Sequence, residues 1–473
     1  MDTKKILGYA AGSLGSAVLG IMTLPLLSWY FPAADIGRII LMQTAAGLGI
    51  LVLGMGLDQA YIREYYAAAD KDTLFKTLFL PPLLSAAVMA AFLLSRPEMP
   101  SEILFSLDDS AAGIGLVLFA LTVLLIRFFS LILRMEERAF AFSSAQLIPK
   151  LTVLPLLPLA VGLLHFPAST DTLGAVYTLA NLTALALLLF QNRCRLKAAW
   201  RAPFSSTLLH RGLRYGIPLA LGNLAYWGLT SADRFFLKGY AGLEQLGIYS
   251  MGITFGAAAL VFQNIFSTVW TPHIFRMVEE NAPMPHISAT AESAAALLAA
   301  AVCLTGIFSP LVSVLLPETY APVRFIIVSC MLPPLFYTLT EISGIGLNVV
   351  RKTRLITLAN LTALSANLLL LRLLVPSEGA RGAAVACAAS FWLFFVLKTE
   401  SSSRLWQPLK RLPLYTHTLF CLASATIHAC FGTRENHPLF AAVWTIYLAG
   451  CILRHKTELN RLFCRLKNMG STS

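Results

Sequence analysis

Long apolar runs separated by short polar segments dominate the pattern of this chain. A transmembrane helix needs about 20 consecutive, mostly apolar residues, and runs of that length predict fourteen spans. The first six lie near 6–30, 37–60, 74–94, 111–133, 143–164 and 172–190. Six more follow a basic segment, near 213–236, 246–270, 289–316, 322–347, 355–375 and 379–397, and two close the chain near 415–432 and 437–453. We therefore expect an all-α, polytopic helical membrane protein.

Composition supports this expectation. Hydrophobic residues make up 57% of the chain and charged residues 13%, and the mean hydropathy is +0.71. A soluble protein of this length would need more charge to cover its surface. The first apolar run ends in Trp29 and Tyr30, residues typical of a membrane interface. We expect an uncleaved first span rather than a signal peptide.

The net charge of +12 comes mainly from Lys and Arg in the segments between spans. With the N-terminus in the cytoplasm, 27 of the 36 basic residues, Lys150 and Lys398 among them, belong to the inner side. Eight belong to the outer side and Arg127 lies inside a span. This asymmetry follows the positive-inside rule and predicts that both termini are cytoplasmic. Because no basic patch with interleaved aromatic residues is present, we predict no nucleic-acid partner.

The two sets of six spans resemble each other. Residues 34–48 align with residues 244–258 at a shift of 210, which matches Gly37 to Gly247. Two repeats of one orientation are a transporter architecture with the substrate site between the halves. We predict a six-helix lobe over 1–200, a second over 201–410, and two extra helices with a basic cytoplasmic tail over 411–473.

Ionisable residues inside the spans are the first candidate site residues, because a charge in hydrocarbon needs a partner or a polar cavity. Arg127 lies about two-thirds of the way along the fourth span. It either faces a cavity, where its guanidinium would suit phosphate, or snorkels to the inner surface. Asp58 and Arg63 close the second span, either as site residues or as ordinary interfacial charges.

Further candidates follow the middle of the chain. Asp233 and Arg234 stand side by side near the far end of the seventh span, where we expect a binding or gating role. Glu341, about one turn from the inner end of the tenth span, would carry a proton, bind a cation or make a structural hydrogen bond. Asn223 would line a sugar path or join helices. The predicted substrate-binding set is Arg127, Arg63, Asp58, Asp233, Arg234, Glu341 and Asn223.

The sequence contains no motif of a catalytic or nucleotide-binding site. There is no GxxxxGK[ST], HExxH or GxSxG, and none of the eight cysteines forms a CxxC. We predict no enzyme activity, no cofactor, no metal site and no structural disulfide.

Four segments carry a resemblance to a known family. They are 56–66 (GLDQAYIREYY), 214–251 with its P…ADR…GYAGLEQLGIYSM pattern, 314–322 (VLLPETYAP) and 344–354 (GIGLNVVRKTR). On these segments the chain resembles the polysaccharide-transport family of lipid-linked oligosaccharide flippases. That family belongs to a superfamily with multidrug/toxin exporters and the lipid II flippase. Within it, flippases of bacterial O-linked protein (pilin) glycosylation pathways are the most similar.

The resemblance implies two six-helix lobes around a cationic cavity in the bacterial inner membrane. The implied substrate is an undecaprenyl-diphosphate-linked glycan, moved from the cytoplasmic to the periplasmic leaflet by alternating access. Arg127, Arg63 and Arg234 are the candidate cationic contacts. Expected partners are this lipid-linked glycan, membrane lipids, and glycosyltransferases or an oligosaccharyltransferase of the same pathway.

Two other functions remain open. A cation-coupled multidrug exporter of the same superfamily would share the fold, but such exporters favour acidic cavity residues. A membrane glycan polymerase or ligase would need catalytic residues, usually in a large outer loop, and this chain has no outer segment of that size.

Overall fold

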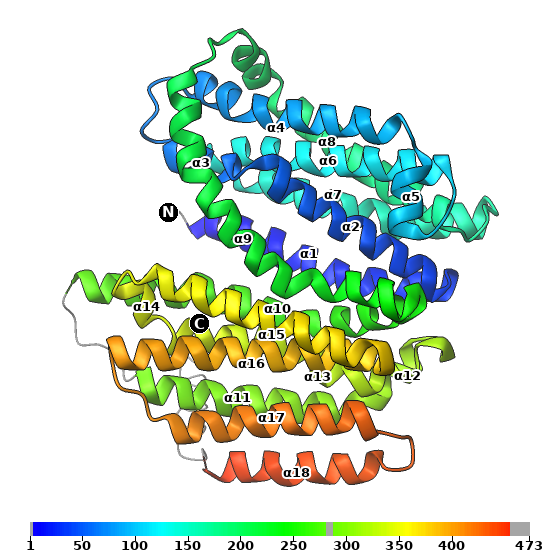
Figure 1. Cartoon of the computed structure of the whole chain (residues 1–473), viewed down its shortest axis with the longest axis vertical. Helices are drawn as coiled ribbons and strands as arrows, with labels where there is room; N and C mark the ends of the chain where they lie inside the picture. The colour runs from blue at the N-terminus through cyan, green and yellow to red at the C-terminus, as the bar shows by residue number, and fades with distance from the viewer. Residues whose placement is uncertain (1–2, 281–286, 455–473) are drawn as a thin grey trace. The chain divides into compact units, whose positions relative to one another are not determined.

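A computed structural model describes residues 3–280 and 287–454 of the chain (Figure 1). The described residues are almost entirely helical and contain no strand, which confirms the predicted all-α class. Each predicted span has a helix of 18 or more residues: α1, α2, α4, α6, α7, α8, α9, α10, α11, α13, α15, α16, α17 and α18. Within residues 3–280 and 287–454, ten helical segments are long and apolar enough to cross a membrane. The predicted basic tail, from residue 455 on, lies outside the described residues.

The chain forms two compact units, Met1–Ser250 and Met251–Ser473. The helices of the first unit are α1 (Thr3–Tyr30), α2 (Ala33–Gly54), α3 (Leu57–Glu64), α4 (Lys71–Leu94), α5 (Glu98–Phe105), α6 (Ser110–Met135), α7 (Ala139–Pro158) with a π-helical extension (Leu159–Leu163), α8 (Thr170–Arg201) and α9 (Ser206–Tyr240). Helix α10 (Gly242–Glu279) begins in this unit and continues into the next. Helix α9, which the sequence assigned to the second lobe, packs on α2, α3 and α4.

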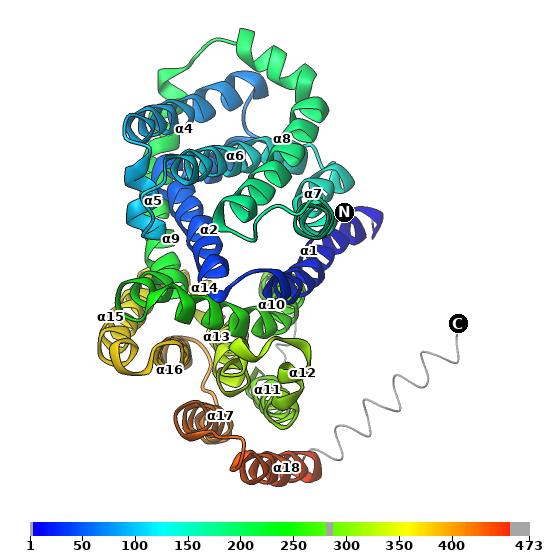
Figure 2. The same ribbon diagram turned by 90° about the vertical axis from the view of Figure 1, so that its right-hand side faces the viewer.

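The second unit holds the rest of α10 and the helices that follow it. They are α11 (Ile287–Phe308), two 3-10 turns (Ser309–Leu311 and Glu318–Tyr320), α12 (Val312–Leu315), α13 (Val323–Ser343), α14 (Gly346–Val349), α15 (Thr353–Glu378), α16 (Ala380–Leu405), α17 (Arg411–Phe431) and α18 (His437–Arg454). The last two helices pack on α11 (Figure 2).

Helix ends differ from the predicted spans where charged residues continue a helix. The segment predicted as a basic loop after residue 190 is helical to Arg201, and α9 begins at Ser206. Lys76 Nζ donates to the carbonyl oxygens of Trp200, at 2.9 Å, and Ala202, at 2.6 Å, which holds the end of α8. Hydropathy identifies only the part of a helix that suits lipid. The predicted span is therefore shorter than the helix.

Helix α4 shows how sequence sets both its start and its lipid-facing side. Asp70 caps its first turn, accepting hydrogen bonds from the Thr73 hydroxyl and the Asp72 backbone N–H, and these bonds lower the pKa of the Asp70 carboxyl. Further along the helix, Leu84, Val88 and Phe92 recur at four-residue intervals and are 56%, 70% and 60% exposed. Such an apolar stripe suits contact with lipid.

The glycines that the repeat aligns meet in the first unit. A Cβ atom placed on Gly37 of α2 would lie 2.3 Å from the carbonyl oxygen of Leu243. A Cβ atom placed on Gly247 of α10 would lie 2.0 Å from the carbonyl oxygen of Ala33. Leu243 follows Ala33 by the same 210 residues that separate the two glycines. Equivalent residues of the two helices therefore make the same contact in both directions, as they do in an interface with two-fold symmetry.

Candidate functional site

An ion pair joins two of the predicted site residues. Arg127 of α6 donates from Nε and Nη2 to Asp58 Oδ2, at 3.1 Å and 2.7 Å. The Asp58 side chain is 12% exposed and that of Arg127 is 37% exposed. A guanidinium has five N–H groups, and three of those on Arg127 have no partner among the described residues. The pair therefore leaves a partly exposed, oriented cation.

A sharp break between α2 and α3 places Asp58 opposite Arg127. Met55 and Gly56 both adopt left-handed backbone, with φ of 50° and 69°, which favours glycine. A Cβ atom on Gly56 would also lie 2.2 Å from the carbonyl oxygen of Gly216 on α9. Asp58 then falls in the first turn of α3, where the positive end of the helix dipole favours a carboxylate.

Arg63 does not pair with Asp58, although the sequence puts them five residues apart. Its guanidinium carbon lies 4.2 Å from the centre of the Tyr215 ring on α9, a cation–π geometry. Arg63 and Arg127 thus both flank the region where α9 crosses the α2–α3 break. Asp58 is largely buried, and its charged partner is Arg127.

Asp233 and Arg234 lie further along α9 and do not pair through their side chains. Asp233 is 2% exposed and accepts a hydrogen bond from the Tyr249 hydroxyl of α10. Arg234 Nη1 donates to the carbonyl oxygen of Thr230 at 3.4 Å. Asp233 follows Gly216 by 17 residues, about 26 Å along a helix, so it cannot belong to the Arg127 site. Asn223 is half-buried between these two regions of α9.

Glu341 belongs to the second unit, on α13, and accepts a hydrogen bond from the Thr271 hydroxyl of α10 at 3.3 Å.

Two lysines assigned to the inner ends of spans lie elsewhere. Lys150 is in the middle of α7 and donates to the carbonyl oxygen of Ser16 on α1. Lys398 is inside α16 and only 4% exposed. Hydropathy alone predicts neither placement, because Lys150 lies within a predicted span and Lys398 borders one.

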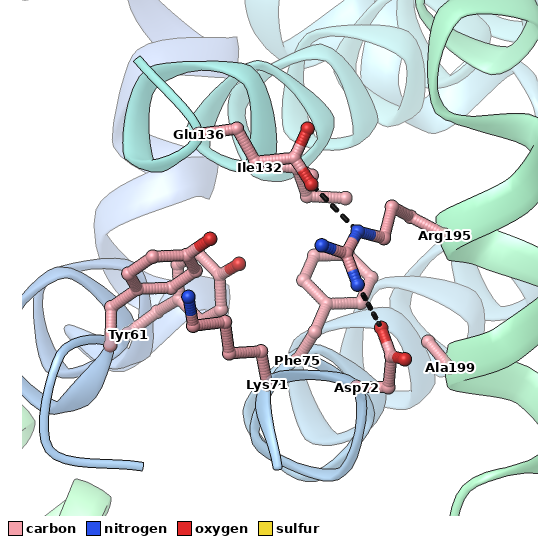
Figure 3. Close-up of a pocket in the computed structure, with 9 residues that line it drawn as sticks. Tyr61, Lys71, Asp72, Phe75, Ile132, Glu136, Arg195 and Ala199 are labelled. Carbon is pink, nitrogen blue, oxygen red and sulfur yellow. Dashed lines mark hydrogen bonds and ion pairs between the residues drawn. The ribbon is translucent and has the colours of Figure 1, made fainter. Parts of the chain in front are cut away.

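The sequence reasoning missed a second charged cluster in the first unit. Figure 3 shows Arg195 reaching from α8 between α6 and α4. Its Nε lies 2.7 Å from Glu136 Oε1, and its Nη1 lies 3.7 Å from Asp72 Oδ1. Lys71 lies over the Tyr65 ring at the same hollow, 4.6 Å from its centre. The sequence held one signal for this cluster. The helix ends that carry Asp72, Glu136 and Arg195 lie on the same predicted side of the membrane, and their charges are of opposite sign.

The donors of Arg127 suit the binding of an anion. Among residues 3–280 and 287–454, no three His, Cys, Asp or Glu side chains gather where a metal ion could be held. Arg127 offers free N–H groups to an anion while Asp58 fixes its orientation. A diphosphate, with several acceptor oxygens, is the kind of group such donors recognise.

Comparison with known proteins identifies both a family and a fold. The family model described as "Polysaccharide biosynthesis protein" matches residues 3–278. The fold is similar to that of the lipid II flippase MurJ in an inward closed conformation, with a TM-score of 0.71, 12% identity, and 95% of this chain and 99% of that chain covered. No curated protein matches the sequence.

Multidrug exporters share the fold less closely. An inward-facing multidrug resistance MATE family transporter of the MOP superfamily gives a TM-score of 0.56 at 15% identity, covering 86% of this chain and 96% of that one. The Vibrio cholerae MATE transporter VcmN gives 0.54 at 15% identity, covering 85% and 96%.

Proposed function

We propose that this chain, which belongs to the polysaccharide biosynthesis protein family, is a flippase for an undecaprenyl-diphosphate-linked oligosaccharide. It moves the lipid-linked glycan from the cytoplasmic to the periplasmic leaflet of a bacterial inner membrane by alternating access. The multi-pass helical fold and its likeness to the lipid II flippase support this proposal. The observation that carries it is the Asp58–Arg127 pair, which holds a partly exposed guanidinium inside a membrane helix bundle.

The physical task explains why such a group is useful. A diphosphate and a glycan cannot cross hydrocarbon unaided, because each unsatisfied polar group costs several kcal/mol there. Arg127 would bind phosphate oxygens through the N–H groups that Asp58 leaves free. Arg63 adds a second cation beside the α2–α3 break. Asp58 prevents Arg127 from being an isolated charge when no substrate is bound.

The finer assignments follow from the same proposal. Asn223 would contact sugar hydroxyls, and Asp233, Arg234 and Glu341 would act in binding or gating. Both termini would be cytoplasmic, and the glycan would serve glycoprotein assembly of the pilin type. Glycosyltransferases that build the substrate and an oligosaccharyltransferase that consumes it would be partners in this pathway.

Ligand binding to the purified protein in nanodiscs tests the substrate class. The probe is a fluorescent undecaprenyl-diphosphate glycan, compared with the corresponding monophosphate and with ethidium, a cationic drug. We expect the diphosphate to bind the wild-type protein most tightly. Arg127→Ala should weaken its binding by about 10-fold or more, since hydrogen bonds to charged groups contribute roughly 1.5–3 kcal/mol.

Arg434→Ala is the matched control, because this arginine is 62% exposed and pairs with Glu318, far in sequence from the proposed site residues. It should bind the diphosphate like the wild-type protein. Tight ethidium binding with no preference for the diphosphate would contradict the flippase proposal and favour the multidrug exporter. Equal binding of diphosphate and monophosphate would contradict the assigned role of the arginine.

A further inference from the structure

Two arginines at one end of the second unit play no part in the proposed lipid-glycan site. Arg324 is the second residue of α13 and Arg381 is the second residue of α16, and these two helices pack along each other. Figure 1 shows α12, which precedes α13, at the same end as the start of α16 and the turn from α17 into α18. The charge count assigns both residues to the outer side of the membrane. We call them the outer arginine pair.

The outer arginine pair gathers around one aromatic ring. The guanidinium carbon of Arg324 lies 4.4 Å from the centre of the Phe325 ring, and that of Arg381 lies 5.7 Å from the same centre. Phe325 is buried, whereas both arginines are half-buried. Cation–π contact attracts each guanidinium to the ring, but it provides no acceptor for most of the N–H groups. The ring thus brings together two cations from separate helices.

No acid neutralises the outer arginine pair. In the part of the chain that the structure describes, no carboxylate oxygen lies within 4.0 Å of either guanidinium group. Arg324 Nε is buried and has no hydrogen-bond partner among these residues. Glu318 is engaged by Arg434, at 2.5 Å, and both of these charges act on Arg324 electrostatically. The pair therefore keeps both its charge and its hydrogen-bond donors.

The position of each arginine is also unfavourable for its own helix. The N-terminal end of a helix carries a partial positive charge, which disfavours a cation and favours an anion. Neither α13 nor α16 has an acidic residue in its first turn, and neither has a side-chain cap. An anion bound at this end would accept from the guanidinium groups and would offset the charge of the helix ends.

Exposed apolar side chains lie at the same end of the second unit. Val314 and Leu315 of α12, Phe431 at the end of α17 and Leu439 in the first turn of α18 are each more than half exposed. Cations beside exposed apolar side chains suit the boundary between lipid headgroups and acyl chains. A lipid phosphate could reach the arginines while its acyl chains cover the apolar side chains. A free phosphate ion would leave these side chains uncovered.

We propose that the outer arginine pair binds the phosphate group of an anionic phospholipid in the outer leaflet. The phosphate oxygens accept hydrogen bonds from both guanidinium groups and remove the repulsion between them. The bound lipid holds the starts of α13 and α16 together. The site lies in the second unit and does not use Arg127 or Asp58. It can therefore fail or succeed independently of the proposed flippase function.

Native mass spectrometry of the purified protein in detergent tests this site. The probes are phosphatidylglycerol, which has a net negative charge, and phosphatidylcholine with the same acyl chains, whose choline cation offsets the phosphate. The wild-type protein should bind phosphatidylglycerol more tightly. Arg324→Gln and Arg381→Gln should each weaken phosphatidylglycerol binding by roughly 5-fold, the contribution of one basic residue at an anionic membrane surface. Binding of phosphatidylcholine should not change.

Arg96→Gln is the matched control, because Arg96 is exposed and assigned to the same side of the membrane but belongs to the first unit. It should keep the lipid preference of the wild-type protein. Arg324→Lys keeps the positive charge and should retain part of the preference that Arg324→Gln loses. Rescue of this kind distinguishes a lost phosphate contact from a disturbed fold.

Three results would overturn the proposal. The first is equal affinity of the wild-type protein for the two lipids, and the second is the same loss in Arg96→Gln as in Arg324→Gln. The third concerns inorganic phosphate, added alone at millimolar concentration as a competitor. It lacks acyl chains and should leave phosphatidylglycerol bound. Displacement of the lipid by inorganic phosphate would show a site for the free ion instead.

Discussion

The paired glycine contact between α2 and α10 gives a prediction whose size can be worked from the structure. In Gly247→Ala the new Cβ would lie 2.0 Å from the carbonyl oxygen of Ala33, whereas ordinary contacts begin near 3.4 Å. The two helices must therefore part by roughly 1.4 Å, the difference between these distances. Because the obstructing atom belongs to the backbone, no change of rotamer can relieve the clash.

Overpacking of this kind costs about 1–3 kcal/mol, and the better helix propensity of alanine returns at most about 1 kcal/mol. Gly247→Ala should therefore lower the midpoint of thermal unfolding in detergent. Gly37→Ala should do the same, since its Cβ would lie 2.3 Å from the Leu243 carbonyl oxygen. The double variant should lose less than the sum of the two, because both changes act on one contact.

Gly49→Ala provides the control within α2. A Cβ atom at Gly49 meets nothing within 4 Å, so this change should be neutral or stabilise by up to about 1 kcal/mol. Our reasoning would be refuted if Gly247→Ala were as stable as Gly49→Ala. Strictly additive losses for the two contact glycines would also refute it.

Three further predictions concern single interactions in the first unit. Asp58→Asn removes the counter-charge of Arg127 and should destabilise the protein by about 1.5–3 kcal/mol, and adding Arg127→Met should recover part of that loss in chemical unfolding. Tyr249→Phe removes the hydroxyl that donates to the buried Asp233 carboxylate and should lower the thermal midpoint, at a cost of about 1–3 kcal/mol; an unchanged midpoint would contradict this. Hydrogen bonding lowers the pKa of Asp70 in the folded protein. The stabilisation that the Asp70 carboxylate provides is therefore present above the unfolded pKa of about 4 and is lost as pH falls through the folded pKa. The difference in thermal midpoint between the wild-type protein and Asp70→Ala should accordingly shrink between pH 6 and pH 3.

The long helices of this chain could be predicted from hydropathy, because every helix that spans a membrane needs a run of apolar residues. Each apolar run became one long helix. The ends were less predictable, since a helix such as α8 continues past the apolar run into charged residues as far as Arg201. Lys398 borders an apolar run, but it is buried within α16, against which α13 packs.

The candidate site was predictable in its residue types but not in its pairings. The position of Arg127 inside a span required a partner, but Asp58 lies 69 residues away and spacing cannot connect them. The left-handed turn at Met55 and Gly56 sets the direction of the acid. The same limit explains why the cluster around Arg195 was missed, because its partners come from two other helices.

Flipping by the purified protein is the measurement that tests the central claim most directly. Proteoliposomes would carry a labelled undecaprenyl-diphosphate glycan, and an external sugar-modifying enzyme would report how much of it reaches the outer leaflet with time. We predict flipping that depends on the wild-type protein, is absent from empty vesicles and is strongly reduced in an equal amount of folded Arg127→Ala protein. Glycan exposure no faster than in empty vesicles, with folded protein in both orientations, would contradict the account.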